Sequence, residues 1–451
     1  MRSELFGKYE AYVERHRDLL LGAERYIREN PELGFKEWKT SSFLEKEYEK
    51  LGYKLKKAGD IPGFTVDIDT GRPGPTLLIF GELDAVVCAE HPDSDPVTGA
   101  VHACGHNCQS AALLGVAAAL KEEGALDGMS GRIRLCAVPA EELLDLGYRE
   151  ELRRKGVIKY MGGKVEFMHR GLLDGCDLAF MVHTTGGPSR RIFTKKYSNG
   201  CISKTVTFTG RAAHAGASPG KGINALYAAN LGLGAVNALR EKYTDGKYVR
   251  IHSIITNGGQ MVNAIPSSVT LETQVRAASF DTIKSVGREV SRAYAAGAAA
   301  MGAKVTVSDR PGYYPVCNDE ALLQFAEETA LMCTEPELVK TSRETGGGCS
   351  DMGDIMSVMP AIHPYVSGAA GKGHGADYRI VDPGSAVLFS AEYQLVLAHR
   401  LLEGGAGAAV RIISESKPEF ASKEDYFAAV DSVMTDTDAV EYTEDGAVLR
   451  F

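Results

Sequence analysis

Short apolar runs recur along the first part of the chain, separated by polar loops and by longer stretches of helical character. Three of these runs, at 76–80, 132–138 and 178–182, predict buried strands. The stretch 110–123 is rich in alanine and leucine and predicts a helix. Together these elements indicate an α/β fold with an open sheet.

Each of the three predicted strands ends in a polar group. Glu82 and Asp84 follow the first strand, Glu141 and Glu142 follow the second, and His183 ends the third. Open α/β sheets place their ligand crevice at the carboxyl ends of their strands. We therefore expect these polar side chains to converge.

Cys104 and His106 lie two residues apart in the run 102–106 (HACGH), just ahead of the predicted helix. A thiolate and an imidazole together suit zinc and related divalent ions, and Gly105 lets a short loop turn both donors toward one ion. Taken alone, the run also fits a buried cysteine beside a surface histidine. The polar groups at the strand ends favour a metal site.

Adjacent carboxylates fit the surroundings of a divalent cation. One can bind the ion while its neighbour accepts a proton from metal-bound water. A pair such as Glu141-Glu142 is more often a solvated surface feature. This pair directly follows an apolar run and Pro139-Ala140, which favours the functional interpretation.

The middle of the chain has a different order of elements. It predicts strand, helix, strand, strand, helix and strand at 202–210, 224–239, 249–256, 269–277, 282–301 and 304–309. This β-α-β-β-α-β order is that of a ferredoxin-like unit. We expect it to be a lid or dimerisation domain inserted into the α/β catalytic domain.

The predicted elements divide the chain into four segments. The catalytic domain has its first part at 1–198 and its second part at 311–403, on either side of the inserted domain at 199–310. A C-terminal extension of unknown role, acidic toward its end, occupies 404–451.

The composition is that of an ordinary globular protein of 451 residues. Nine cysteines without paired spacing indicate reduced thiols, and a charged amino-terminal stretch with no bilayer-length apolar run predicts a cytoplasmic protein without a membrane segment. The formal charge of −9, with no basic cluster among aromatic residues, argues against nucleic acid as a partner.

These motifs together resemble the co-catalytic metallohydrolases that include aminoacylases, carnosinases and glutamate carboxypeptidases. The likeness is greatest to the branch of hippurate, indole-acetyl-amino-acid and aminobenzoyl-glutamate hydrolases, and it covers nearly the whole chain up to the tail. The segments that carry it are 30–35 (NPELGF), 83–85 (LDA), 102–106 (HACGH), 139–142 (PAEE), 210–216 (GRAAHAG), 220–226 (GKGINAL) and 263–266 (NAIP).

The resemblance implies two divalent ions per subunit, Zn²⁺ or Mn²⁺. Their implied ligands are Cys104, His106, Glu142, His183 and His374. Glu141 would be the general base, and Asp84 would orient a metal ligand. His363 is the alternative to His374, but only His374 has glycine on both sides, which lets a loop approach the ions closely.

The resemblance also assigns roles within the inserted domain. His214 would polarise the scissile carbonyl, either within its own chain or across a homodimer interface. Asn263 and Arg276 are candidates for binding a substrate carboxylate, Arg276 because a guanidinium group can grip one through two hydrogen bonds. An arginine late in a strand is more often a surface residue.

Two departures from the family pattern stand out. After Cys-Gly-His the branch commonly has Asp, whereas this chain has Asn107, an uncharged amide that lowers the negative charge near the second ion. A glycine-rich turn after Glu142 is replaced by a long charged stretch at 143–170. We expect this stretch to reshape the part of the site that receives the acyl group.

The expected function is hydrolysis of the amide bond in an N-acyl amino acid or dipeptide-like small molecule, by metal-activated water with Glu141 as base. A catalytically silent relative that only binds a ligand or partner is the alternative. A cysteine hydrolase built on Cys104 and His106 is a further alternative, although residues two apart seldom present nucleophile and base correctly.

Overall fold

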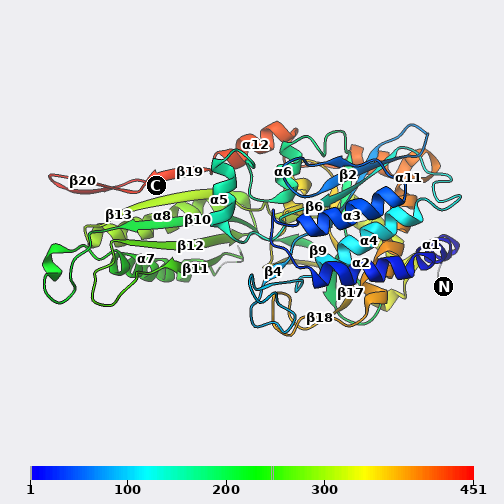
Figure 1. Ribbon diagram of the computed structural model, residues 1–451. Helices are drawn as coiled ribbons and strands as arrows, with labels where there is room; N and C mark the ends of the chain where they lie inside the picture. Colours follow the sequence, from blue (N-terminus) through cyan, green and yellow to red (C-terminus); the bar gives the residue numbers. More distant parts are fainter. Residues whose placement is uncertain (1–2, 245, 247) are drawn as a thin grey trace. The chain divides into compact units, whose positions relative to one another are not determined.

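A computed structural model describes residues 3–244, 246 and 248–451 (Figure 1). The chain forms two compact units. The first unit contains the residues up to Tyr197 together with Val316–Glu344 and Ser350–Ala421. The second unit contains Ser198–Pro315, Thr345–Cys349 and Ser422–Phe451.

The first unit is built on a mixed sheet with the strand order β1-β2-β6-β3-β7-β16. These strands are β1 (Lys56–Lys57), β2 (Phe64–Asp69), β3 (Thr76–Glu82), β6 (Arg132–Val138), β7 (Leu178–Met181) and β16 (Ala361–Ile362). Central strand β3 runs parallel to both β6 and β7, its two neighbours. The three strands predicted from apolar runs are thus confirmed, and their carboxyl ends share one edge of the sheet.

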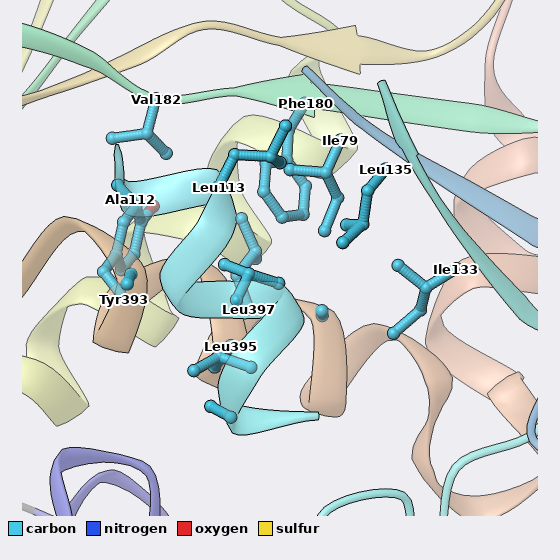
Figure 2. Packing of buried hydrophobic residues seen from close by; sticks show 14 of the residues in the cluster. Ile79, Ala112, Leu113, Ile133, Leu135, Phe180, Val182, Tyr393, Leu395 and Leu397 are labelled. Carbon is cyan, nitrogen blue, oxygen red and sulfur yellow. The ribbon is translucent and has the colours of Figure 1, made fainter. Parts of the chain in front are cut away.

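Helix α4 (His106–Ala119) is the central helix of this unit, and every one of its residues is buried. Figure 2 shows Leu113 of this helix pointing toward Ile79 and Phe180 of the sheet. The sequence predicted the helix at 110–123, but it begins and ends four residues earlier. His106 is therefore the first residue of the helix, not a residue ahead of it as predicted. The early start follows from Gly105, whose left-handed backbone (φ 100°) ends the preceding loop.

Further helices and a second sheet complete the first unit. The helices are α1 (Glu4–Arg15), α2 (Arg17–Glu29), α3 (Trp38–Lys50), α5 (Leu146–Arg154), α6 (Gly163–His169), α9 (Glu320–Cys333), η3 (Pro336–Leu338), α10 (Met352–Met356), η4 (Gly384–Phe389) and α11 (Ser390–Glu415). The second sheet and a small two-stranded pair contain β14 (Val316–Cys317), β9 (Ile192–Ser198), β17 (Pro364–Ala370), β18 (Arg379–Ile380), β15 (Val339–Gly346), β8 (His183–Gly186), β4 (Val86–Val87) and β5 (Ala100–Val101). No helix in the described part of the chain has both the length and the apolar character needed to cross a bilayer.

The second unit has the predicted β-α-β-β-α-β order. Its elements in chain order are β10 (Gly200–Thr209), η1 (Pro219–Lys221), α7 (Ala225–Leu239), η2 (Arg240–Lys242), β11 (Arg250–Asn257), β12 (Ser268–Ala277), α8 (Phe280–Ala300) and β13 (Lys304–Pro311). The antiparallel sheet has the order β11-β12-β10-β13-β19, and α7 and α8 pack against it (Figure 1). An α/β fold with a ferredoxin-like insertion is therefore confirmed.

The end of the chain contributes to both units. Residue 404, where the sequence predicted the start of an extension, lies inside α11, at a kink where residues 403–406 have non-helical backbone. The later elements are α12 (Lys423–Asp431), β19 (Thr435–Asp438), β20 (Val440–Thr443) and β21 (Gly446–Leu449). Strand β19 pairs with β13 and so adds a fifth strand to the sheet of the second unit.

Replacing Leu113 with Ala tests how much of the stability comes from α4. Leu113 is 2% exposed and packs in the main hydrophobic cluster. Because the substitution leaves a cavity as well as losing buried apolar surface, we expect the free energy of unfolding to fall by about 2–5 kcal/mol. Denaturant unfolding measures this loss. Leu331→Ala, at a position 48% exposed, is the control and should change stability by less than about 0.5 kcal/mol. Equal losses in both variants would contradict the central role of α4.

Candidate metal centre

Polar side chains from separate parts of the first unit meet at the carboxyl edge of its sheet. Potential metal-binding atoms within 4.8 Å of one another form three overlapping groups. The groups are Cys104, His106 and His183; Cys104, Glu142 and His374; and Glu82, His106 and Glu141. All five ligands implied by the family resemblance thus lie together, as does Glu141.

The parallel strands explain this convergence. Strand β3 ends at Glu82, β6 ends at Val138, and β7 leads directly to His183. Between β6 and the glutamate pair, Ala140 adopts a left-handed backbone with φ 56°. Such a conformation is costly for a residue other than glycine, and it persists where surrounding contacts fix it. Here the amide of Ala140 donates to Oε1 of the fully buried Glu37, at an N–O distance of 2.7 Å.

Two close backbone approaches position the remaining ligands. A side chain at Gly105 would have its Cβ 2.7 Å from Tyr378 Oη and 2.8 Å from Thr184 Cβ, so only glycine fits between Cys104 and His106. His374 has φ 63°, and its amide donates to the carbonyl of Ala103 at 2.8 Å. This bond ties the late histidine loop to the segment that carries Cys104.

The imidazole contacts fix which ring nitrogen can bind a metal. Nδ1 of His106 lies 2.9 Å from the carbonyl oxygen of Asp84, and Nδ1 of His183 lies 2.8 Å from that of Thr184. Because a carbonyl only accepts hydrogen bonds, Nδ1 carries a hydrogen in both rings, and Nε2 is the ring nitrogen available to a metal. Nε2 of His106 is buried and has no hydrogen-bond partner in the described part of the chain. Nε2 of His183 lies 3.5 Å from Cys104 Sγ. This donor set fits a divalent ion of the zinc type.

Asp84 joins two of the ligand residues. Its Oδ2 accepts from the amide of Glu142 at 2.8 Å, and its Oδ1 lies 3.2 Å from Nδ1 of His106. Asp84 is fully buried. Its contacts match the orienting role that the family resemblance implies for it.

The two adjacent glutamates have opposite electrostatic environments. Burial raises the pKa of Glu141 well above its usual value, and the charges of Glu82, Glu142 and Asp351 raise it further. Burial also raises the pKa of Glu142, but the nearby His374, whose Nε2 is 2.9 Å from Glu142 Oε1, more than offsets this and leaves the pKa lowered. Glu142 is thus suited to bind a cation as an anion, and Glu141 to accept a proton.

Two other histidines near the site belong to none of the three groups. His363 is 3% exposed, and its ring centroid lies 5.7 Å from that of His183. His102, in the same run as Cys104, is also buried. Burial lowers the pKa of each to about 3, so both are neutral rings packed beside the site.

The second unit holds the three residues assigned to carbonyl polarisation and carboxylate binding. His214 is exposed, its Nδ1 accepts from the amides of Gly216 and Ala217, and the amide of Ala215 bonds to the carbonyl of Asn263. Arg276 instead lies near the far end of β12, where its guanidinium donates to Gln274 at 2.7 Å. Ser268, the first residue of β12, lies roughly 26 Å from Arg276 along the strand, and Asn263 precedes Ser268. His214 and Asn263 are therefore neighbours, and Arg276 lies away from both.

Two buried, positively charged side chains were not identified from the sequence, and both belong to the segment 143–170. Arg149 on α5 is 1% exposed and donates to the carbonyls of Ala140, Glu142 and Met161. Lys164 on α6 is fully buried and contacts the carboxylates of Glu82 and Asp351. A single basic residue in a charged stretch carries no signal of burial, so neither side chain could be identified from the sequence. Glu82 was expected to converge with the other strand-end groups but was given no role in the site.

Comparisons with known proteins identify relatives of this chain. The sequence profile of peptidase family M20/M25/M40 matches residues 78–393. The chain is 31% identical over 275 residues to mouse Xaa-Arg dipeptidase, an alignment that spans 60% of this chain and 58% of the relative. It is 28% identical to N-acetyl-L-cysteine deacetylase of Bacillus subtilis, over 69% of this chain and 72% of the relative. It is 27% identical to IAA-amino acid hydrolase ILR1-like 4 of Arabidopsis thaliana, over 72% of each chain.

Solved structures share the fold. A putative aminohydrolase from methicillin-resistant Staphylococcus aureus superposes with a TM-score of 0.70 at 21% identity, covering 88% of this chain and all (100%) of the other. A Bacillus subtilis protein described as a dinuclear metal-binding peptidase of the M20 family gives a TM-score of 0.62 at 20% identity, with 87% and 99% coverage. The family profile spans well over half of the chain, which confirms the family predicted from the motifs. The chain belongs to peptidase family M20/M25/M40.

Proposed function

We propose that this protein is a metal-dependent hydrolase of the amide bond in N-acyl amino acids or dipeptide-like small molecules. The observation that carries the proposal is the position of the pair Glu141-Glu142 beside grouped thiol and imidazole donors. Glu142 shares a ligand group with Cys104 and His374, and Glu141 shares one with Glu82 and His106. Relatives named as a dipeptidase and a deacetylase support an amide substrate. The relatives differ in which amide they cleave, so the acyl group is left open.

The proposed cofactor is a pair of divalent ions, Zn²⁺ or Mn²⁺. Their proposed ligands are Cys104, His106, Glu142, His183 and His374. Cys104 belongs to two of the ligand groups, an arrangement that suits two neighbouring ions. When bound, such ions act as Lewis acids and lower the pKa of water toward neutrality. Asp84 would keep His106 and the Glu142 backbone aligned for binding.

Glu141 is the proposed general base. A carboxyl group with a raised pKa can take the proton of the attacking water and later return it to the leaving amine. His214, from the second unit, is proposed to donate a hydrogen bond to the oxygen of the scissile carbonyl as charge develops there. Asn263 would then bind the substrate carboxylate beside it.

A homodimer is proposed through the inserted domain. The outer strand β11 exposes Ile254 (51%) and Ile255 (45%), and α7 exposes Tyr227 (59%) and Leu231 (45%). Exposed apolar side chains on an edge strand and on a helix of the same unit are costly for a monomer, and the edge strand also offers unpaired backbone groups to any partner. A second copy of this chain would cover them by extending the sheet across a twofold axis.

The decisive experiment is a substrate screen of the metal-reconstituted protein. N-acyl amino acids and dipeptides are incubated with protein loaded with Zn²⁺ or Mn²⁺, and the released amine is measured. The expected result is metal-dependent turnover of at least one amide class, abolished by a chelator and restored by metal. Metal binding without turnover of any amide would support a catalytically silent binding protein instead. Activity that thiol alkylation abolishes even when metal saturates the site would support a cysteine hydrolase.

Substitution of the two glutamates separates base from ligand. Glu141→Gln should retain the metal and lose at least about a hundredfold in kcat, because it removes the proton acceptor. Glu142→Gln should lose metal, because an amide is a poorer ligand than a carboxylate. Elemental analysis and steady-state kinetics on both variants measure these effects. Near-normal turnover in Glu141→Gln would refute the proposed mechanism.

His214→Ala tests the contribution of the second unit. The expected result is a decrease in kcat of about 10²–10³-fold with unchanged metal content. Mixing this variant with Glu141→Gln then tests sharing between subunits. If His214 acts in the partner's site, random exchange should restore about a quarter of wild-type activity, because half of the dimers are mixed and each has one complete site. No recovery despite demonstrated subunit exchange would confine His214 to its own chain.

A further inference from the structure

Glu82 is a buried carboxylate that the proposed ligand set does not use. It is the last residue of β3, and its side chain is fully buried. Its Oε2 lies 3.1 Å from Nε2 of His106. Its carboxylate also forms, with His106 and Glu141, the third group of potential ligands within 4.8 Å of one another.

The contact between Glu82 and His106 lacks hydrogen-bond geometry, although the two groups are close enough to form an ion pair when the imidazole is protonated. Nδ1 of His106 faces the carbonyl of Asp84, so Nε2 is the ring atom directed at Glu82. A ring nitrogen and a carboxylate oxygen at this distance need a proton or a metal ion between them. Ligand atoms that are each about 2.0–2.1 Å from one tetrahedral zinc ion lie roughly 3.3 Å apart, so the spacing suits a shared ion.

Neighbouring side chains hold the Glu82 carboxylate in this position. Oε1 contacts the ammonium of Lys164, and Oε2 accepts from Nε2 of Gln109 at 2.9 Å. Lys164 also contacts Asp351, and all of these side chains are buried. Glu82, Asp351 and Lys164 together carry a net charge of −1, so the cluster still attracts a cation. Lys164 thus prevents rotation of Glu82 without neutralising the site.

We propose that Glu82 is a further ligand of the ion bound at His106, and that Lys164 is the positioning residue that keeps the Glu82 carboxylate aimed at this ion. The inference rests on the proposed metal-dependent function and adds a carboxylate to the proposed ligand set. It also gives the segment that carries Lys164 a role at the metal centre. A carboxylate ligand of this kind compensates for the uncharged Asn107, whose amide donates to Glu24 at 2.8 Å.

Metal titration of the full-length, chelator-stripped protein tests the proposal without an activity assay. Competition with a chromophoric chelator gives the Zn²⁺ affinity of each site. Glu82→Gln should lower the affinity of one ion about 10–100-fold and leave the other unchanged. Glu166→Gln is the matched control, because Glu166 is another buried glutamate, on the helix that carries Lys164, and pairs with Arg170. Its Zn²⁺ affinities should match those of the wild type.

The Co²⁺-loaded protein tests the positioning role of Lys164. Loss of a carboxylate ligand changes the d–d absorption of Co²⁺, so Glu82→Gln and Lys164→Met should give similar altered spectra, and Lys164→Arg should restore the wild-type spectrum at least in part. Circular dichroism and thermal unfolding of each metal-free variant show whether it is folded. If Lys164→Met does not fold, the Glu82→Gln titration and spectrum decide the question.

Two results would overturn the proposal. Wild-type affinity for both ions in Glu82→Gln, even with a lowered Tm, would make the cluster purely structural. An equal loss of affinity in Glu82→Gln and Glu166→Gln would indicate general destabilisation. The proposed function fails in a different way: wild-type protein that binds Zn²⁺ but cleaves no amide would leave the ligand assignment intact.

Discussion

The arrangement of the first unit depends on the cost of burying several carboxylates side by side. Glu37, Glu82, Asp84, Glu141 and Asp351 are all largely or fully removed from water at one end of the sheet. Isolated buried charges of like sign repel strongly, and each needs a cation or hydrogen-bond donors nearby. Lys164, Arg149 and backbone amides meet part of this need, and a bound divalent cation would meet the rest. Breaking a buried ion pair by removing one partner typically costs about 3–5 kcal/mol, so these residues form a coupled set.

The same constraint explains why the segment 143–170 matters. The sequence predicted that this stretch reshapes the acyl side of the site. In the structure it supplies Arg149, whose guanidinium contacts the backbone of the glutamate pair, and Lys164, beside Glu82. Leu146 is 8% exposed, and Leu144 packs with a small apolar cluster that contains Tyr378. A glycine-rich turn could provide neither of these positively charged side chains, so this departure from the family pattern changes the electrostatics of the site.

Local sequence patterns were sufficient to predict those elements whose structure depends on the spacing of apolar residues and on their order in the chain. The strands β3, β6 and β7 and the ferredoxin-like order could be predicted because apolar periodicity is a local property. Glu141, Glu142 and His183 could be placed together because parallel strands end at one edge. Cys104 and His106 could be placed near them because they lie at the start of the helix between two of these strands. The start of α4 was misplaced by four residues because it is set by the backbone of Gly105, without a side-chain cap. Lys164 and Asp351 could not be found, since their contact joins residues distant in the chain.

Strand β19 has a consequence for how the polypeptide acquires its structure during synthesis. The ferredoxin-like segment leaves the ribosome with both β11 and β13 as open edges, and β13 is covered only when the last part of the chain arrives. Until then the nascent sheet offers unpaired backbone groups to any neighbouring strand. The first unit likewise needs residues on both sides of this segment. Neither unit can therefore finish folding before later segments of the chain have been synthesised. Pairing between segments that are distant in the sequence is slow, and it is a late step in the folding of this protein.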